Sequence, residues 1–144
     1  MIKKYINEYD VIIETDKDKI VDQIGFRKIE VDGTDIKLNG KSIFLRGISM
    51  HEESPIRGGR AYSNEDAEKL LSSAIELGCN FVRLAHYPHN EHMARVADEL
   101  GMLLWAEVPV YWTIHWDNPA TYANAENQLT ELVTRDRNRA SIII

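Results

Sequence analysis

The sequence predicts an α/β fold in which antiparallel hairpins precede a run of alternating strands and helices. Two observations support this class. Up to about residue 48, short apolar segments alternate with polar turns, whereas the later apolar runs alternate with segments of helical periodicity. The second pattern is typical of parallel sheets, whose neighbouring strands need long crossover connections. We therefore expect a small antiparallel region followed by a larger parallel α/β region.

Short polar turns separate the β segments of the antiparallel region. Residues 16–19 are all charged, follow the first alternating segment and turn the chain back. Asn39 and Gly40 stand between two apolar segments and predict a type I′ turn, in which both central residues need positive φ. The strands expected here cover residues 5–14, 20–21, 24–31, 36–38 and 42–48.

Two amphipathic helices are expected in the first part of the α/β region. Ser63 can cap the first helix with Asp66 in the capping-box position, and Gly78 ends it. The second helix begins near Asn90, shows apolar residues at helical spacing and ends at Gly101. Each helix lies between two apolar runs, as a crossover connection requires.

A third helix and a last strand continue the alternation. Asn118 and Pro119 open a helix that ends near residues 138–139, with an inner stripe of Leu129, Leu132 and Val133. Eight units of a (β/α)8 barrel take about 250 residues, so residues 42–144 would hold about half of one. The expected parallel strands cover residues 42–48, 80–85, 102–108 and 141–144, the last of which is cut short.

The composition narrows the class of function. Lys and Arg total 17 against 23 Asp and Glu, a net charge of -6, which argues against nucleic acid or an anionic membrane as a partner. The single cysteine, Cys79, can form no intramolecular disulfide. The N-terminal residues lack the pattern of a signal peptide, which leaves the cytoplasm and the periplasm open, and no apolar run has the length of a membrane span.

Polar and aromatic residues follow the expected parallel strands. In parallel α/β folds, ligands bind at the carboxyl ends of the strands, so these residues should lie on one face. Imidazoles, carboxylates and aromatic rings together suit a sugar, because hydroxyls need donors and acceptors while the C–H face of the sugar stacks on a ring. The residues concerned are Ser49, His51, Glu52, Glu53, His86, Tyr87, Pro88, His89, Asn90, Glu107, Pro109, Tyr111, Trp112, His115 and Trp116.

Each of these candidates also has a structural alternative. His51 and Glu52 could be surface loop residues, and Glu107 could form an ion pair with Arg83 or Arg46. A metal site is a further alternative, although the histidine spacing lacks the i, i+4 pair of the zinc-protease motif. That site would use His86, His89 and His92.

Several motifs, in order and with matching spacing, resemble glycoside hydrolase family 2, which contains β-galactosidases and β-glucuronidases. The most specific stretch centres on His86-Tyr87-Pro88, preceded by Ala85 where many members have Ser. The resemblance implies that residues 1–31 are the last strands of an immunoglobulin-like sandwich. It implies that residues 32–144 are the first half of the catalytic TIM barrel. The matching stretches are residues 25–31, 38–47, 51–52, 82–90, 97–101 and 106–109.

The resemblance also implies a function. Members hydrolyse β-glycosides with retention, using one glutamate as acid/base and another as nucleophile. Residues 138–144 match the start of the run that leads to the acid/base, and Glu52 and Glu107 match neither catalytic position. We therefore expect the chain to be a fragment of an exo-β-glycosidase and to be inactive alone. Among the possible activities of the parent enzyme, β-galactosidase is the first choice.

The resemblance and the strand-end pattern together give one set of expected substrate-binding residues and no cofactor or metal. A β-glucuronidase, a metal-dependent hydrolase and a non-catalytic carbohydrate-binding or interaction fragment are the alternatives. The expected partner is a β-linked carbohydrate, and the edges of the half barrel should promote self-association. The substrate-binding set is His86, His51, Glu52, Arg83, Glu107, Tyr111 and Trp112.

Overall fold

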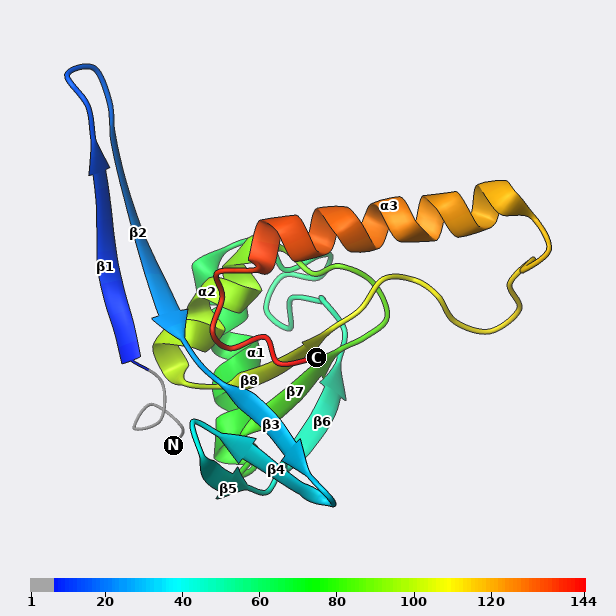
Figure 1. The fold of residues 1–144 in the computed structure, drawn as a ribbon, viewed down its shortest axis with the longest axis horizontal. Helices are drawn as coiled ribbons and strands as arrows, with labels where there is room; N and C mark the ends of the chain where they lie inside the picture. The colour runs from blue at the N-terminus through cyan, green and yellow to red at the C-terminus, as the bar shows by residue number, and fades with distance from the viewer. Residues whose placement is uncertain (1–6) are drawn as a thin grey trace.

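The computed structural model describes residues 7–144, which form three small sheets and three helices (Figure 1). Two of the sheets are antiparallel and the third is parallel. In chain order the elements are β1 (Asn7–Glu14), β2 (Lys19–Phe26), β3 (Ile29–Asp32), β4 (Asp35–Leu38), β5 (Lys41–Ile43), β6 (Gly47–Met50), α1 (Asn64–Glu76), β7 (Phe81–Leu84), α2 (Glu91–Leu100), β8 (Leu103–Ala106) and α3 (Pro119–Asp136).

Strands β1 and β2 form a hairpin that projects from the rest of the molecule (Figure 1). The expected single segment over residues 24–31 is wrong, because the chain leaves one sheet and enters another within it. β2 ends at Phe26 after pairing with β1, and β3 starts at Ile29 and pairs with β4. Two residues without strand pairing make this change of sheet possible.

The second sheet has the strand order β3-β4-β5 and contains the expected tight turn. Asn39 and Gly40 have φ values of 50° and 76°, which confirms positive φ at both positions. The expected strand over residues 42–48 is instead two strands, because the Asn80 side chain holds the backbone between β5 and β6. The Asn80 amide accepts from the Arg46 N–H at 2.7 Å and donates to the Phe44 carbonyl at 2.9 Å.

The predicted domain boundary between residues 31 and 32 falls inside β3. That strand pairs along its whole length with β4, so the sheet spans both sides of the boundary. The assignment of residues 1–31 to an immunoglobulin-like sandwich stays a prediction. The β1–β2 hairpin and the β3-β4-β5 sheet are separate sheets within the described residues.

The third sheet is parallel, in the order β6-β7-β8, and helices α1 and α2 lie on one of its faces (Figure 1). Ser63 caps α1 by accepting the Asp66 N–H, and Gly101 ends α2 with φ 69°, as expected. Gly47 starts β6 where it meets β7, and a Cβ there would lie 2.6 Å from the Phe81 carbonyl oxygen. Only glycine therefore allows the two strands to pair at this point.

The main core lies between this sheet and the two helices. Leu71 of α1, Val82 of β7, Ala97 of α2 and Leu104 of β8 are all fully buried. The C-terminal residues 141–144 run beside β8 in the parallel direction, with a bridge between Leu104 and Ile142. The order of the α/β region thus places the ends of β6, β7 and β8 side by side.

Helix α3 is attached differently. It follows a long loop, and its N-terminal part extends beyond the sheet (Figure 1). Of its predicted inner stripe only Leu132 is buried, whereas Leu129 and Val133 are 51% and 55% exposed, so the expectation of a buried stripe is wrong for these two. Within residues 7–144, no helix combines the length and the apolar character that crossing a membrane would need.

Candidate functional site

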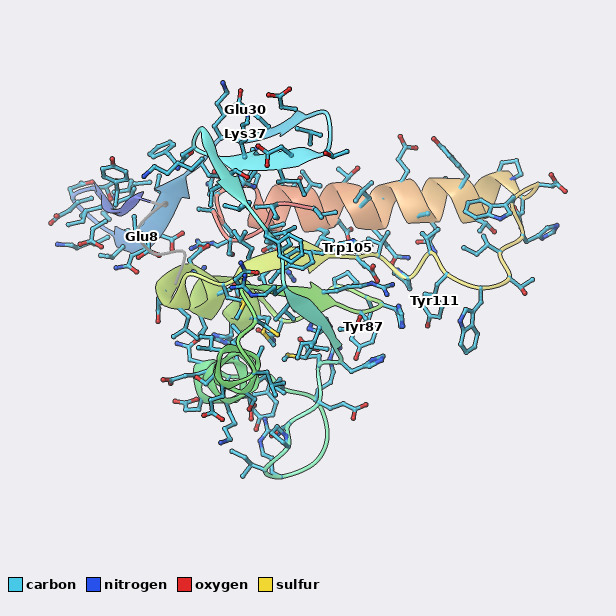
Figure 2. The ribbon with its side chains drawn as sticks, turned by 90° about the horizontal axis from the view of Figure 1, so that it is seen from below. Glu8, Glu30, Lys37, Tyr87, Trp105 and Tyr111 are labelled. Atoms are coloured by element: carbon cyan, nitrogen blue, oxygen red, sulfur yellow. The ribbon has the colours of Figure 1, made fainter. Side chains whose placement is uncertain are left out.

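The side chains that follow β6, β7 and β8 gather where these three strands end. The His51 and His86 rings meet edge to face with centroids 5.4 Å apart, and Tyr111 lies 5.0 Å from His86 on its other side. Tyr87 lies 6.2 Å from His51. Figure 2 shows Tyr87 and Tyr111 toward the carboxyl ends of the strands. Three different strand ends therefore contribute rings to one cluster.

An ion pair lies directly beneath His86. Arg83 donates from Nε to Glu107 Oε1 at 2.6 Å and from Nη2 to Glu107 Oε2 at 3.2 Å. The same Nη2 lies 3.2 Å from His86 Nδ1. The hydrogen bond to Glu107 raises the pKa of Arg83 above its usual value, and the Arg83 guanidinium lies over the Trp105 ring at 4.9 Å. The alternative in which Glu107 pairs with Arg83 is thus the geometry observed.

Glu52 is not part of the ring cluster, although it follows β6 directly. Its side chain is buried, one carboxylate oxygen accepts from Arg60 Nε and the other accepts from the backbone N–H of Asn90. Both oxygens are therefore engaged within the protein. The carboxylate joins the loop after β6 to the start of α2.

A second carboxylate in the same loop region, Asp66, was expected only as a capping residue. It is buried and accepts hydrogen bonds from the Ser54 hydroxyl at 2.9 Å and from the Tyr62 N–H at 3.1 Å. It also pairs with Arg57. The Tyr62 hydrogen bond is the largest of the effects that hold the pKa of Asp66 below its usual value. No sequence pattern links these loop residues, because the loop brings them together only after folding.

The remaining histidines have separate surroundings. His89 is buried, donates from Nε2 to the Ala85 carbonyl at 3.0 Å, and has its pKa lowered by burial. The Nδ1 atom of His92 lies 2.6 Å from the amide oxygen of Asn64. Among residues 7–144 no group of three or more His, Cys, Asp or Glu side chains is arranged to hold a metal ion.

The loop between β8 and α3 carries the other aromatic candidates away from the cluster. Trp112 is 94% exposed, touches Tyr111 edge to face at 5.7 Å, and has φ 58°, a region that aromatic residues rarely adopt. His115 and Trp116 line a separate, largely apolar cavity of about 580 Å³ between this loop and α3. Of the four histidines expected on one face, His51 and His86 alone form the cluster.

The structure brings most of the expected binding residues together. His51, His86, Arg83, Glu107 and Tyr111 form one connected group, Trp112 touches its edge, and Glu52 lies in the loop interior. Charged and aromatic side chains here lie together at the carboxyl ends of parallel strands. In barrel proteins, this is the place where small polar ligands bind.

Comparison with known proteins identifies the family. The model described as "Glycosyl hydrolases family 2, TIM barrel domain" matches residues 29–144, and the chain belongs to this family. A β-galactosidase of Thermoanaerobacterium thermosulfurigenes is 36% identical over 99% of this chain and 18% of its own length. A β-glucuronidase of Streptococcus agalactiae is 32% identical over 89% of this chain and 24% of its own length.

Solved structures agree with the fold. The β-glucuronidase from Ruminococcus gnavus in complex with D-glucaro-d-lactam superposes with a TM-score of 0.81 at 28% identity, covering 96% of this chain and 24% of that one. The family 2 β-galacturonidase from Eisenbergiella tayi bound to galacturonate superposes with a TM-score of 0.77 at 32% identity, covering 86% and 23%. The chain therefore spans less than a quarter of the length of these structures.

Proposed function

We propose that the chain is part of a retaining exo-β-glycosidase and that its ring cluster binds the terminal sugar of the substrate. The cluster of His51, His86 and Tyr111 above the Arg83–Glu107 pair carries this proposal. It offers hydrogen-bonding nitrogens beside aromatic faces, which is the combination that a sugar ring requires. Membership in glycosyl hydrolase family 2 supports the reaction class.

The first candidate substrate is a β-galactoside. Tyr111, Trp112 and Trp116 follow β8 as they do in galactosidase-like members, and one relative is a β-galactosidase at 36% identity. The second candidate is a β-linked uronic acid, which the names of the Ruminococcus gnavus and Eisenbergiella tayi proteins support. Both sugars carry hydroxyl groups around the ring, so the same cluster can bind either one.

Binding of methyl glycosides to the chain tests this proposal. In a titration followed by NMR, methyl β-galactoside should shift the backbone signals of residues 51, 86 and 111, and methyl β-glucuronide serves as the competing ligand. The His86→Ala variant should lose the shifts, whereas His115→Ala should keep them because His115 lines the separate cavity. Equal shifts with both methyl α-anomers, or with His86→Ala, would refute a site for β-linked sugars.

The chain by itself is expected to show no turnover. The Glu52 and Glu107 carboxylates are each paired with an arginine, and the resemblance to the family places neither of them at a catalytic position. Release of nitrophenol from nitrophenyl β-galactoside by homogeneous protein is the measurement. Turnover that disappears in the His86→Ala variant would contradict this expectation.

A further inference from the structure

The Nδ1 atom of His86 faces two groups of opposite character. Arg83 Nη2 lies 3.2 Å away, within hydrogen-bond distance, and Glu107 Oε2 lies 3.5 Å away. An imidazole nitrogen can accept a hydrogen bond only when it carries no proton, and it can donate one only when it does. The two neighbours therefore favour opposite protonation states of Nδ1, and the geometry has to decide between them.

The hydrogen atoms of Arg83 settle this choice. A guanidinium has five N–H donors and no acceptor. Nε donates to one oxygen of Glu107, and Nη2 donates one of its two hydrogens to the other oxygen. The second hydrogen of Nη2 remains for His86 Nδ1, which must then be the acceptor.

The alternative would place a proton on Nδ1 and a hydrogen bond to Glu107. The distance of 3.5 Å is at the outer limit for such a bond, and both oxygens of Glu107 already accept from Arg83. A proton on Nδ1 would also point at an Nη2 that can only donate. Arg83 itself is held in place, because its guanidinium lies over the Trp105 ring at 4.9 Å.

We infer that Arg83 is a positioning residue that fixes His86 as the neutral tautomer with its proton on Nε2. The imidazole then presents a hydrogen-bond donor at the ring atom farthest from Arg83. One third of the His86 side chain is exposed, and within residues 7–144 Nε2 has no hydrogen-bond partner. A ligand that hydrogen-bonds to Nε2 must therefore offer an acceptor, and on the function proposed above this is a hydroxyl oxygen of the sugar.

Nitrogen NMR of the whole chain, labelled at histidine, tests the tautomer directly. The spectrum is taken above the ordinary histidine pKa of about 6.5, with the His86 signals assigned from their loss in His86→Gln. We expect His86 to give a protonated Nε2 and an unprotonated Nδ1. The reverse pattern, or two averaged nitrogens, would overturn the inference before any arginine variant is made.

A pair of arginine variants tests the cause. Arg83→Lys keeps a positive charge beside Glu107 but cannot supply three hydrogens from one planar group, so the two His86 nitrogen signals should move toward each other. Arg95→Lys is the matched control, since Arg95 also pairs with carboxylates, those of Asp22 and Glu91, and is not part of the ring cluster. An unchanged tautomer in a folded Arg83→Lys chain would show that Arg83 does not fix it. If that variant fails to fold, the spectrum of the native chain still decides.

Sugar affinity is measured separately, which keeps the two claims apart. Arg83→Lys should weaken methyl β-galactoside binding about tenfold, the loss of one hydrogen bond, while Arg95→Lys should not. A fixed Nε2–H tautomer in a chain that binds no sugar would refute the proposed function and uphold the inference about Arg83. Sugar binding by a chain in which His86 carries its proton on Nδ1 would uphold the proposed function and refute the inference about Arg83.

Discussion

Helices α2 and α3 are neighbours in the sequence and differ sharply in how they are packed. α2 buries Met93, Ala94, Val96 and Ala97 against the sheet and α1, whereas α3 buries only Leu132 and Asp136 along its 18 residues. Both helices have a well-defined N-cap, Asn90 and Asn118 respectively. A cap and an apolar stripe are therefore enough to form a helix, but its contribution to stability depends on what covers the stripe.

The loops after β6 and after β8 differ in the same way as these two helices. The loop after β6 is held by two buried carboxylates, Glu52 and Asp66, each with more than one hydrogen-bond partner. The loop after β8 instead leaves Trp112 and Trp116 mostly exposed. Substitutions in the parallel sheet and in α1 or α2 should therefore cost much more stability than substitutions in α3 and the loop before it.

The largest expected effect comes from the core. Leu104 of β8 is fully buried in the core between the sheet and helices α1 and α2, and Leu104→Ala should lower the free energy of unfolding by about 2–5 kcal/mol. Leu129→Ala on α3 removes the same atoms from a half-exposed site and should cost about 0.5 kcal/mol. Urea unfolding curves measure both values. Equal losses would mean that the α3 stripe is covered in solution, and the comparison would fail.

The next effect concerns Arg139, which joins the β1–β2 hairpin to α2. It donates to the Gln23 carbonyl at 2.7 Å and to Asp22, and it lies 3.6 Å from the buried Asp98. Arg139→Met should lower the free energy of unfolding by about 2–3 kcal/mol, because the charged hydrogen bonds to Gln23 and Asp22 are lost and the buried Asp98 loses its neighbouring positive charge.

Arg95→Met is the control for this prediction. Arg95 pairs with the same Asp22 and with Glu91, but its side chain is 42% exposed, so the cost should stay below about 1 kcal/mol. Urea unfolding of both variants gives the comparison. Similar losses for the two variants would show that the burial of Arg139 adds nothing to the free energy of unfolding.

Two buried aspartates should give pH dependences of opposite sign. The pKa of Asp66 lies below its ordinary 3.8, so its contribution is present above 3.8 and is lost as the pH falls through the folded value. Burial raises the pKa of Asp98 above 3.8 against the effect of Ser141 and Arg139, so its contribution is present below 3.8 and is lost as the pH rises.

Unfolding measured across this pH range checks the signs. The stability deficit of Asp66→Asn relative to the native chain should grow as the pH rises from below 3.8, whereas the deficit of Asp98→Asn should shrink. The two variants serve as controls for each other, since both replace a carboxyl group with an amide. Deficits that change in the same direction would contradict the assignment of at least one of the two environments.

The smallest effect on folding should accompany a change in association. Leu129→Ser with Val133→Ser should alter the free energy of unfolding by no more than about 1 kcal/mol, because both side chains are half exposed. The same pair should reduce the self-association that exposed apolar surface favours. Sedimentation at several concentrations measures it, with the exposed Thr134→Ser as control. A native chain that is monomeric throughout would contradict predicted self-association.

Local signals in the sequence were sufficient for much of the fold. The Ser63 cap, the Gly101 stop and the Asn39-Gly40 turn each depend on one or two residues and their immediate neighbours, and each was predicted. The strand ends were also placed well enough to bring His51, His86 and Glu107 together. Such features need no knowledge of distant contacts.

What the sequence could not supply depends on pairing between distant segments. The break between β2 and β3 arises because two sheets pair with one continuous β pattern, and Leu129 is exposed because α3 buries little of its surface against the rest of the chain. Glu52 was expected to bind substrate because it follows a strand. Its partners, Arg60 and Asn90, come from two other segments, and nothing in its own neighbourhood indicates them.

The position of Glu52 has a consequence for how a ligand would meet this surface. The Glu52 carboxylate accepts hydrogen bonds from Arg60 in the loop after β6 and from Asn90, the N-cap of α2, and so links this loop to the start of the helix. His51 directly precedes Glu52, and His86 lies in the short segment that leads to Asn90, so this link restrains both parts of the chain that carry the rings. Binding of a ligand that contacts both rings therefore costs the protein little conformational entropy. The affinity then depends mainly on how well the ligand fits the two rings.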